Sequence, residues 1–207
     1  MAARQIVAIG GSDTGISPAL RARELDPATE VTVVVADAYP NFSICGIPYY
    51  ISGEVTHWSN LAHRSAADLA ATGMRVLTDT CATAINPDAH TLDVLDNTGA
   101  PRQLSYDALI VGTGAISARP PITGLTGPDA LEPNDGVHLL HSMGDTFAVM
   151  NSLTTRDPKT AVIVGADCIG LEMAEALTMR GIQVSREEAK ARDVASRPTR
   201  KPKTRPS

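Results

Sequence analysis

The sequence predicts an α/β fold with a parallel sheet, in which one strand–glycine–helix–strand unit is followed by the start of a second. Two apolar runs that end in glycine carry this prediction, "RQIVAIGG" near the N-terminus and "TAVIVGAD" at residues 160–167. Each is followed by apolar residues at helical spacing, and the first helix leads into another apolar run, "EVTVVVAD". A strand, a glycine turn, a helix and a strand in that order open a doubly wound sheet.

The rest of the first unit is predicted as short elements joined by turns. Residues 13–26 and 65–73 have apolar side chains at helical spacing, and Gly73 closes the second helix. The stretch 74–114 is predicted as several strands, with turns at "NPDA" and "NTGA" and a last buried strand in "YDALIVGTG". Two successive prolines after it interrupt regular structure.

A helix predicted at residues 144–156 precedes the second strand–glycine–helix stretch. In the helix that follows the second glycine run, four apolar side chains form the expected buried face: Ile169, Met173, Ala176 and Leu177. Apolar residues almost disappear after Ser185 and three late prolines follow, so we expect a disordered tail. The expected organisation is a first domain at 1–125, a linker with the start of a second domain at 126–185, and a basic tail at 186–207.

The composition limits the kinds of partner that we expect. Of the 207 residues, 43% are apolar, which allows a substantial core, and the net charge of -5 does not suggest nucleic acid. The tail holds eight of the 18 basic residues and three of the 23 acidic ones, so the body before it is acidic. The N-terminal apolar run is too short for secretion, and no stretch approaches the roughly 18 apolar residues that span a bilayer. We therefore expect a cytoplasmic protein that binds neither nucleic acid nor membrane.

Three cysteines, Cys45, Cys81 and Cys168, are too far apart for a C-x-x-C pair or a metal-binding spacing. An odd number without a secretion signal is typical of a reducing compartment. The five histidines are scattered, so no metal site is expected. Cys45 stands in "NFSICGIPYYISG", where Gly46 and Pro48 indicate a turning chain. A buried small apolar side chain and a redox thiol both remain open for Cys45, whereas Cys81 and Cys168 are expected to be structural.

The first glycine loop, "GGSDTG" at residues 10–15, follows the nucleotide-binding pattern G-x-G-x-x-G with Ser12 at the middle glycine. Gly10 permits the tight turn, and Gly15 lets the helix and the strand pack closely. Around Gly11 and Ser12, backbone N–H groups can then approach a diphosphate, because a helix N-terminus attracts anions. A glycine turn with nothing bound is the alternative.

A nucleotide-binding loop of this kind is expected to be followed about 20 residues later by an acidic residue that binds the ribose. Asp37, at the end of the second apolar run, is the only good candidate. An exposed aspartate that ends a strand and binds nothing explains the same residue equally well.

The second glycine loop, "GADCIG" at residues 165–170, has Asp167 at the middle glycine position, between Gly165 and Gly170. A carboxylate about 5 Å from a phosphate opposes binding by about 3 kcal/mol at an effective dielectric near 20. The helix dipole returns only about 0.3–1 kcal/mol, so nucleotide binding is expected to weaken by roughly a hundredfold. The alternative is that Asp167 is the N-cap of a helix in a unit that binds nothing.

With these motifs in order, the chain resembles the N-terminal part of the flavoprotein pyridine nucleotide-disulfide oxidoreductases. It looks like the branch with a single active cysteine, which contains the coenzyme A-disulfide reductases and related NADH oxidases and peroxidases. Four stretches between residues 5 and 185 carry the resemblance: "VAIGGSDTGIS", "NFSICGIPYYISG", "YDALIVGTGAISARPPITGL" and "TAVIVGADCIGLEMAEAL". The second and third are the specific ones, since members of the family carry F-x-x-C-G-x-P-Y-Y and Y-D-x-L-I-x-x-T-G.

The resemblance implies an incomplete Rossmann-like FAD-binding domain, followed by the start of an NAD(P)H-binding Rossmann unit. NAD(P)H would reduce FAD, and reduced FAD would reduce oxidised Cys45, so that two electrons reach a small disulfide, a peroxide or oxygen. The implied site residues are Gly10, Gly11, Ser12 and Gly15 for FAD, Thr113 and Gly114 near the flavin diphosphate, Gly165 and Gly170 for NAD(P)H, and Cys45 as the redox thiol.

Several positions depart from the family pattern. The family's ribose-binding glutamate aligns with Val35, so Asp37 comes two residues late, and Ile44 stands where relatives often have Asn or Ser. The rest of the NAD(P)H domain and the dimerisation domain have no counterpart, so we expect a truncated chain in which a homodimer lacks its usual interface. The alternatives are an inactive remnant that binds nucleotide weakly or not at all, and an electron-transfer flavoprotein reductase in which Cys45 is incidental.

Overall fold

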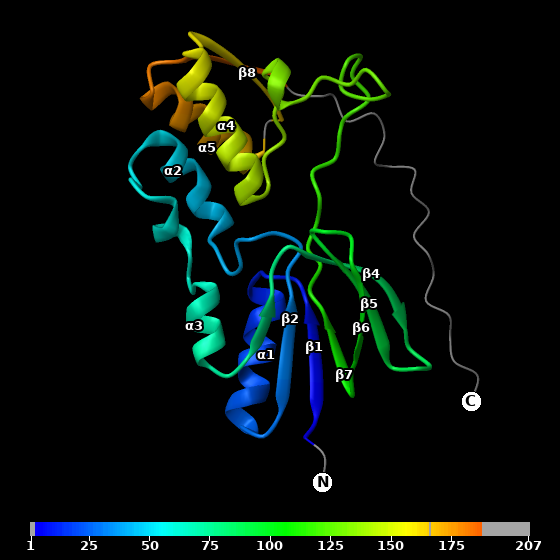
Figure 1. The fold of residues 1–207 in the computed structure, drawn as a ribbon. Helices are drawn as coiled ribbons and strands as arrows, with labels where there is room; N and C mark the ends of the chain where they lie inside the picture. The colour runs from blue at the N-terminus through cyan, green and yellow to red at the C-terminus, as the bar shows by residue number, and fades with distance from the viewer. Residues whose placement is uncertain (1–2, 166, 188–207) are drawn as a thin grey trace, which may run out of the picture. The chain divides into compact units, whose positions relative to one another are not determined.

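The computed structural model of the chain describes residues 3–165 and 167–187 (Figure 1). These residues form two compact units, the first ending at Pro158 and the second beginning at Lys159. The boundary falls within the region 126–185, where the sequence predicts a linker and the start of a second domain. The expected tail at 186–207 lies outside the described residues except for Arg186 and Glu187, which form the end of a strand.

The first unit is built around a parallel four-stranded sheet with the order β3-β2-β1-β7 (Figure 1). β1 pairs with β2 on one side and with β7 on the other, with Val7 opposite Thr32 and Leu109. The strand order therefore reverses beside β1, the place where open α/β sheets bind ligands. This arrangement confirms the predicted α/β fold. The strands are β1 (Gln5–Ile9), β2 (Glu30–Val34), β3 (Arg75–Leu77) and β7 (Ala108–Val111).

Helix α1 (Asp13–Leu25) connects β1 to β2 and covers one face of this sheet. Its side chains at Ile16 and Ala19 are fully buried and pack in one cluster with Ala8 of β1. The two helical positions are three residues apart and therefore share a face, as the sequence predicts. Burial of this face fixes α1 on the sheet, and with it the position of the glycine loop that precedes the helix.

An antiparallel three-stranded sheet packs against the other face. Val7 and Ile9 of β1 alternate with Ala8 along the strand, so their side chains meet Leu92 and Val94 of the second sheet. Both predicted turns, "NPDA" and "NTGA", join strands of this sheet. Its strands are β4 (Thr80–Asn86), β5 (Thr91–Asp96) and β6 (Pro101–Ser105).

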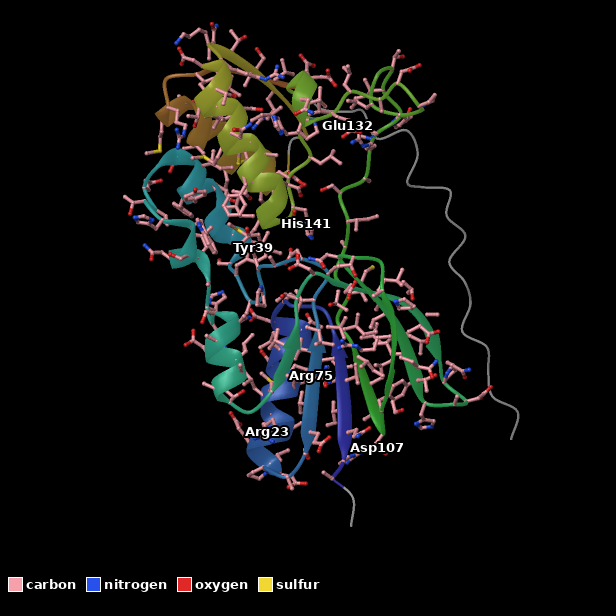
Figure 2. The ribbon with its side chains drawn as sticks, in the orientation of Figure 1. Arg23, Tyr39, Arg75, Asp107, Glu132 and His141 are labelled. Atoms are coloured by element: carbon pink, nitrogen blue, oxygen red, sulfur yellow. The ribbon has the colours of Figure 1, made fainter. Side chains whose placement is uncertain are left out.

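Short helical segments follow β2 and carry the stretch that contains Cys45. Tyr39, Trp58 and Phe147 connect these segments to the last helix of the unit, because each ring lies edge-on to the other two, with centroids between 5.1 and 5.7 Å apart. Figure 2 shows Tyr39 beside the start of that helix. The elements are η1 (Ile44–Gly46), α2 (Ile47–Ser52), η2 (Trp58–Leu61), α3 (Ala66–Ala71), η3 (Pro133–Asp135) and α4 (Met143–Arg156).

The second unit contains β8 (Thr160–Val164), α5 (Cys168–Met179) and β9 (Gln183–Glu187), with the two strands paired in parallel. The prediction of a buried Ile169 is wrong, because this side chain is 47% exposed and Gly170 is buried in its place. The first turn of α5 rests on the glycine loop through Gly170, so Ile169 turns away from the strands. The other three predicted positions are buried: Met173, Ala176 and Leu177.

Two further features are absent from the described part of the chain. No helix within residues 3–165 and 167–187 is both long and apolar enough to cross a membrane. The same residues contain no group of three or more His, Cys, Asp or Glu side chains placed to hold a metal ion.

We expect Gly15→Ala to lower the free energy of unfolding of the first unit by about 2 kcal/mol or more. A Cβ atom at this position would meet the carbonyl oxygen of Gly10, which is backbone and cannot rotate away. Gly144→Ala in α4 is the matched control, since a Cβ there lies 3.6 Å from Ser142 Oγ and alanine favours a helix by up to about 1 kcal/mol. Chemical denaturation compares both variants with the parent. Equal stability of Gly15→Ala and the parent would contradict the prediction.

We also expect the first unit to lose stability in mild acid through His138, whose Nε2 lies 2.9 Å from Ser152 Oγ on α4. Burial lowers the pKa of His138, the positive charge of Arg156 lowers it further, and Asp145 opposes this change. Because the pKa of this histidine is lower in the folded chain than in the unfolded one, the unfolded chain takes up the proton first. The free energy of unfolding is therefore unaffected above the unfolded pKa of about 6.5 and falls as the pH drops below that value. Thermal unfolding between pH 8 and pH 5 should therefore show a smaller loss for His138→Gln than for the parent; equal losses would refute the assignment.

Candidate functional site

The first glycine loop is closed by backbone contacts that leave no room for a side chain at its first and last glycines. A Cβ atom on Gly10, whose φ is +114°, would meet the carbonyl oxygen of Gly112, and one on Gly15 would meet the carbonyl oxygen of Gly10. A Cβ on Gly112 would lie 2.8 Å from the backbone nitrogen of Gly15. The loop is therefore pressed against the end of β7. Gly112 escaped prediction, although a glycine directly after an apolar strand is the signal of such a contact.

The start of α1 presents N–H groups to an anion, although Asp13 places a carboxylate in its first turn. Ser12 is its N-cap, in an extended conformation, and no side chain among the described residues caps the helix there. Gly15 and Ile16 donate their N–H groups to the carbonyl oxygen of Ser12, whereas the earlier N–H groups of a helix have no partner within it. Such groups stand at the positive end of the helix dipole and suit a diphosphate. The backbone of this loop therefore fits a diphosphate, the group that the predicted FAD would place there.

Thr113 and Gly114 follow Gly112 directly after β7, and both are exposed. Because β1 and β7 are parallel neighbours, their carboxyl ends lie at the same edge of the sheet. The structure thus places at one edge the predicted residues of the first unit that belong to these two strand ends: Gly10, Gly11, Ser12, Gly15, Thr113 and Gly114.

Cys45 stands in η1, just before α2, and its thiol is free and exposed. This exposure contradicts the interpretation of Cys45 as a buried apolar side chain. The glycine that follows lies close to η2, because a Cβ on Gly46 would lie 2.6 Å from Leu61 Cδ2 and that side chain would have to move. The N–H of Ser43 donates to the carbonyl oxygen of Leu61 at 2.7 Å. The cysteine segment is therefore laid against η2 with its thiol open to solvent.

The other two cysteines are as open to solvent as Cys45 is. Cys81 on β4 and Cys168 at the start of α5 are also free and exposed. Neither side chain fills a core, so burial does not support the expectation that these thiols are structural. Every thiol of the chain is open to reagents, and experiments on Cys45 must take this into account.

The end of β2 places a valine, rather than a carboxylate, next to the first glycine loop. Val35 is 4% exposed, and a Cβ on Gly11 would lie 2.7 Å from its Cγ1. Asp37 is half-buried, and its Oδ1 accepts the N–H of Tyr39 at 2.8 Å. Burial raises the pKa of Asp37, the N–H of Tyr39 opposes this change, and the charge of Asp79 adds to it. The carboxylate of Asp37 is thus engaged in its own turn, and its role at a ribose stays a prediction.

The second glycine loop has the same backbone plan, but here a carboxylate caps the helix. Gly165 has a φ of +130°, and a Cβ on Gly170 would meet its carbonyl oxygen. Asp167 is the N-cap of α5, and its Oδ1 accepts the N–H of Gly170 at 3.0 Å. Asp167 is therefore confirmed as an N-cap. In the second unit, the predicted residues Gly165 and Gly170 surround a helix start at which a carboxylate already occupies the positive end of the dipole.

Comparison with known proteins places this geometry in a family. The signature of the pyridine nucleotide-disulphide oxidoreductases matches residues 4–200. The NADH oxidase of Methanocaldococcus jannaschii is 27% identical over 179 residues, which are 86% of this chain and 38% of the relative. The structure of reduced Bacillus anthracis CoADR-RHD matches 91% of this chain and 33% of its own, with a TM-score of 0.84 and 29% identity. A NAD-dependent persulfide reductase from A. fulgidus gives a TM-score of 0.79 and 35% identity over 88% of this chain and 33% of its own.

The match covers nearly the whole of this chain but only part of each relative. The chain spans about two-fifths of the length of the curated relatives it matches. The two solved relatives share the fold of about nine-tenths of this chain. The chain therefore belongs to the pyridine nucleotide-disulphide oxidoreductases, a family of flavin-dependent NAD(P)H oxidoreductases.

Proposed function

We propose that the chain is an FAD-dependent oxidoreductase that passes electrons from NAD(P)H through FAD to Cys45 and on to a small disulfide. The observation that carries the proposal is the open start of α1 in the same unit as an exposed Cys45. The path of the chain supports it, because Asn41, four residues before Cys45, donates its backbone N–H to the carbonyl oxygen of Gly11 at 2.6 Å. The nucleotide loop and the thiol segment are thus in direct contact.

The residues that would hold FAD are those at the shared edge of β1 and β7. Asp37 is the proposed ribose ligand, and it would exchange the N–H of Tyr39 for a ribose hydroxyl. When bound, FAD supplies the two-electron step between NAD(P)H and the thiol. The diphosphate would lie on Gly10, Gly11, Ser12 and Gly15 beside Thr113 and Gly114, and NAD(P)H on Gly165 and Gly170.

Cys45 itself would carry out thiol–disulfide exchange. Its thiolate attacks one sulfur of a substrate disulfide, a mixed disulfide forms on Sγ, and the other half leaves as a thiolate. Two electrons and one proton then return Cys45 to the thiolate and release the second thiol. The other cysteines are far away in sequence, so the mixed disulfide waits for external electrons rather than for a resolving thiol.

The acceptor classes follow the names of the relatives. An NADH oxidase and a persulfide reductase are among them, which supports oxygen and a sulfur compound as acceptors, with a peroxide as a third class. We place the protein in the cytoplasm, because its thiols are free and exposed and a reducing compartment keeps them so.

A second candidate function is a nucleotide-binding chain that does not react with NAD(P)H. Asp167 favours this candidate, because its carboxylate holds the place at the start of α5 that a nucleotide diphosphate would take. A third candidate, an electron-transfer reductase, predicts a bound flavin and no role for Cys45.

Addition of FAD to the purified chain should perturb the flavin spectrum and raise the melting temperature, because a ligand that binds only the folded state stabilises it. Cys45→Ser should keep both effects and lose disulfide-dependent NADH oxidation by more than about a hundredfold. Cys81→Ser and Cys168→Ser are matched controls that should retain turnover. A parent chain that responds to FAD in neither measurement would overturn the proposal, and full turnover in Cys45→Ser would favour the electron-transfer candidate.

Asp167→Asn should tighten NADH binding by about tenfold or more, because it removes a negative charge while asparagine still caps α5. Salt screens part of the charge at this exposed site, so the expected gain is below the full Coulomb energy. Asp167→Ala should show the same gain but lose about 1 kcal/mol of unfolding free energy along with the cap. NADH fluorescence titrations measure the affinity, and unchanged values in both variants would show that the carboxylate does not oppose the nucleotide.

A further inference from the structure

Asn41 joins two parts of the first unit that are far apart in sequence. Its backbone N–H donates to the carbonyl oxygen of Gly11 at 2.6 Å, and its Nδ2 donates to Asp13 Oδ1 at 2.8 Å. Its carbonyl oxygen accepts the N–H of His63 at 2.7 Å. One residue therefore holds the first glycine loop on one side and the stretch after η2 on the other.

The conformation of Asn41 is unfavourable for most residues. Its φ is +54°, in the left-handed region that asparagine tolerates better than most side chains do. The residue is 1% exposed, and its Oδ1 has no hydrogen-bond partner among the described residues. The unpaired amide oxygen costs free energy, which the hydrogen bond of Nδ2 to Asp13 and the tolerance of asparagine for this backbone conformation oppose. Strain of this kind collects at functional sites.

The residues that follow Asn41 lead directly to the thiol. Phe42 forms an isolated bridge with Ala62, and Cys45 follows three residues later in η1. The segment 41–46 is thus fixed at its start by the glycine loop and along its length by the stretch after η2. Within this segment, Asn41 makes the hydrogen bonds to the glycine loop and the start of α1.

Through Asp13, the side chain of Asn41 contacts the start of α1 directly. It is the first residue of the helix, it is exposed, and it lies inside the loop between Ser12 and Gly15. A free carboxylate at this helix start would oppose a diphosphate by charge. The hydrogen bond from Asn41 Nδ2 holds that carboxylate against the cysteine segment and leaves its charge in place.

The geometry points to Asn41 as a positioning residue that couples the first glycine loop to the segment of Cys45. It acts through Gly11 and Asp13 on one side and through the peptide chain on the other. A diphosphate in the loop then orders residues 41–46, and removal of the Asn41 amide uncouples the two segments. The inference rests on the proposed function for the identity of the ligand, whereas the hydrogen bonds of Asn41 exist in the chain without a cofactor.

Hydrogen–deuterium exchange of the full chain tests this coupling without any cofactor. Asn41→Gly keeps the left-handed backbone and the backbone hydrogen bonds but removes the amide. Exchange should rise about tenfold both in peptides that cover residues 10–16 and in those that cover 41–46, and stay unchanged in the β4–β5 hairpin. An increase confined to residues 41–46 would overturn the inference, because it would show a purely local role.

Asp13→Ala and Asp13→Asn form a matched pair, because the position is exposed and both variants remove the same charge. Asp13→Asn keeps an acceptor oxygen for Asn41 Nδ2, and Asp13→Ala does not. We expect Asp13→Ala to reproduce the faster exchange in both segments, and Asp13→Asn to stay within about threefold of the parent. If the two variants exchange alike, the side chain of Asn41 does not couple the segments.

Addition of FAD separates this inference from the proposed function. In the parent, FAD should slow exchange in both segments, whereas in Asn41→Gly it should slow only residues 10–16. Equal slowing of both segments in the variant would overturn the role of Asn41. If FAD changes nothing in the parent, the proposed function fails, and the exchange rates without cofactor still decide the coupling.

Discussion

The close backbone approach of Gly10, Gly15 and Gly112 is the constraint on which the rest of the first unit depends. Only glycine leaves room for two carbonyl oxygens between β1, α1 and the end of β7. This approach sets the start of α1 at the edge of the sheet where the two neighbouring strands end, the edge from which Thr113 and Gly114 follow. Packing and anion binding are therefore one requirement, and a single methyl group in the loop would disturb both.

The two glycine loops show how one backbone plan gives two chemically different helix starts. The N–H groups of α1 have no side-chain cap at Ser12, whereas those of α5 are served by the carboxylate of Asp167. An aspartate cap stabilises its helix whether or not a ligand is present, but it also brings a charge that competes with a phosphate. The cap that stabilises α5 therefore also opposes nucleotide binding in the second unit. In the first unit, a bound diphosphate would itself supply the missing cap of α1.

Local patterns were sufficient for most of the fold, because tertiary packing agrees with them. Ile16 and Ala19 share a helix face and both enter the core. Periodicity failed at Ile169, since it assigns a face to the whole helix but does not say where the helix first touches its strands. The site shows a sharper limit: Gly112 and Asn41 act through contacts with a loop far away in the sequence, and no pattern within a short window encodes such a contact. The glycines of the loop itself were predictable, because their spacing is local.

The three exposed thiols also set how many intermolecular disulfides one chain can form. A chain with one reactive group stops at a dimer when it is oxidised, and a chain with two forms linear assemblies. Cys45, Cys81 and Cys168 lie on different elements and are all free, so each can cross-link to a different neighbour. Three accessible thiols make the polypeptide trifunctional toward disulfide formation, so oxidation in air can build branched rather than linear assemblies.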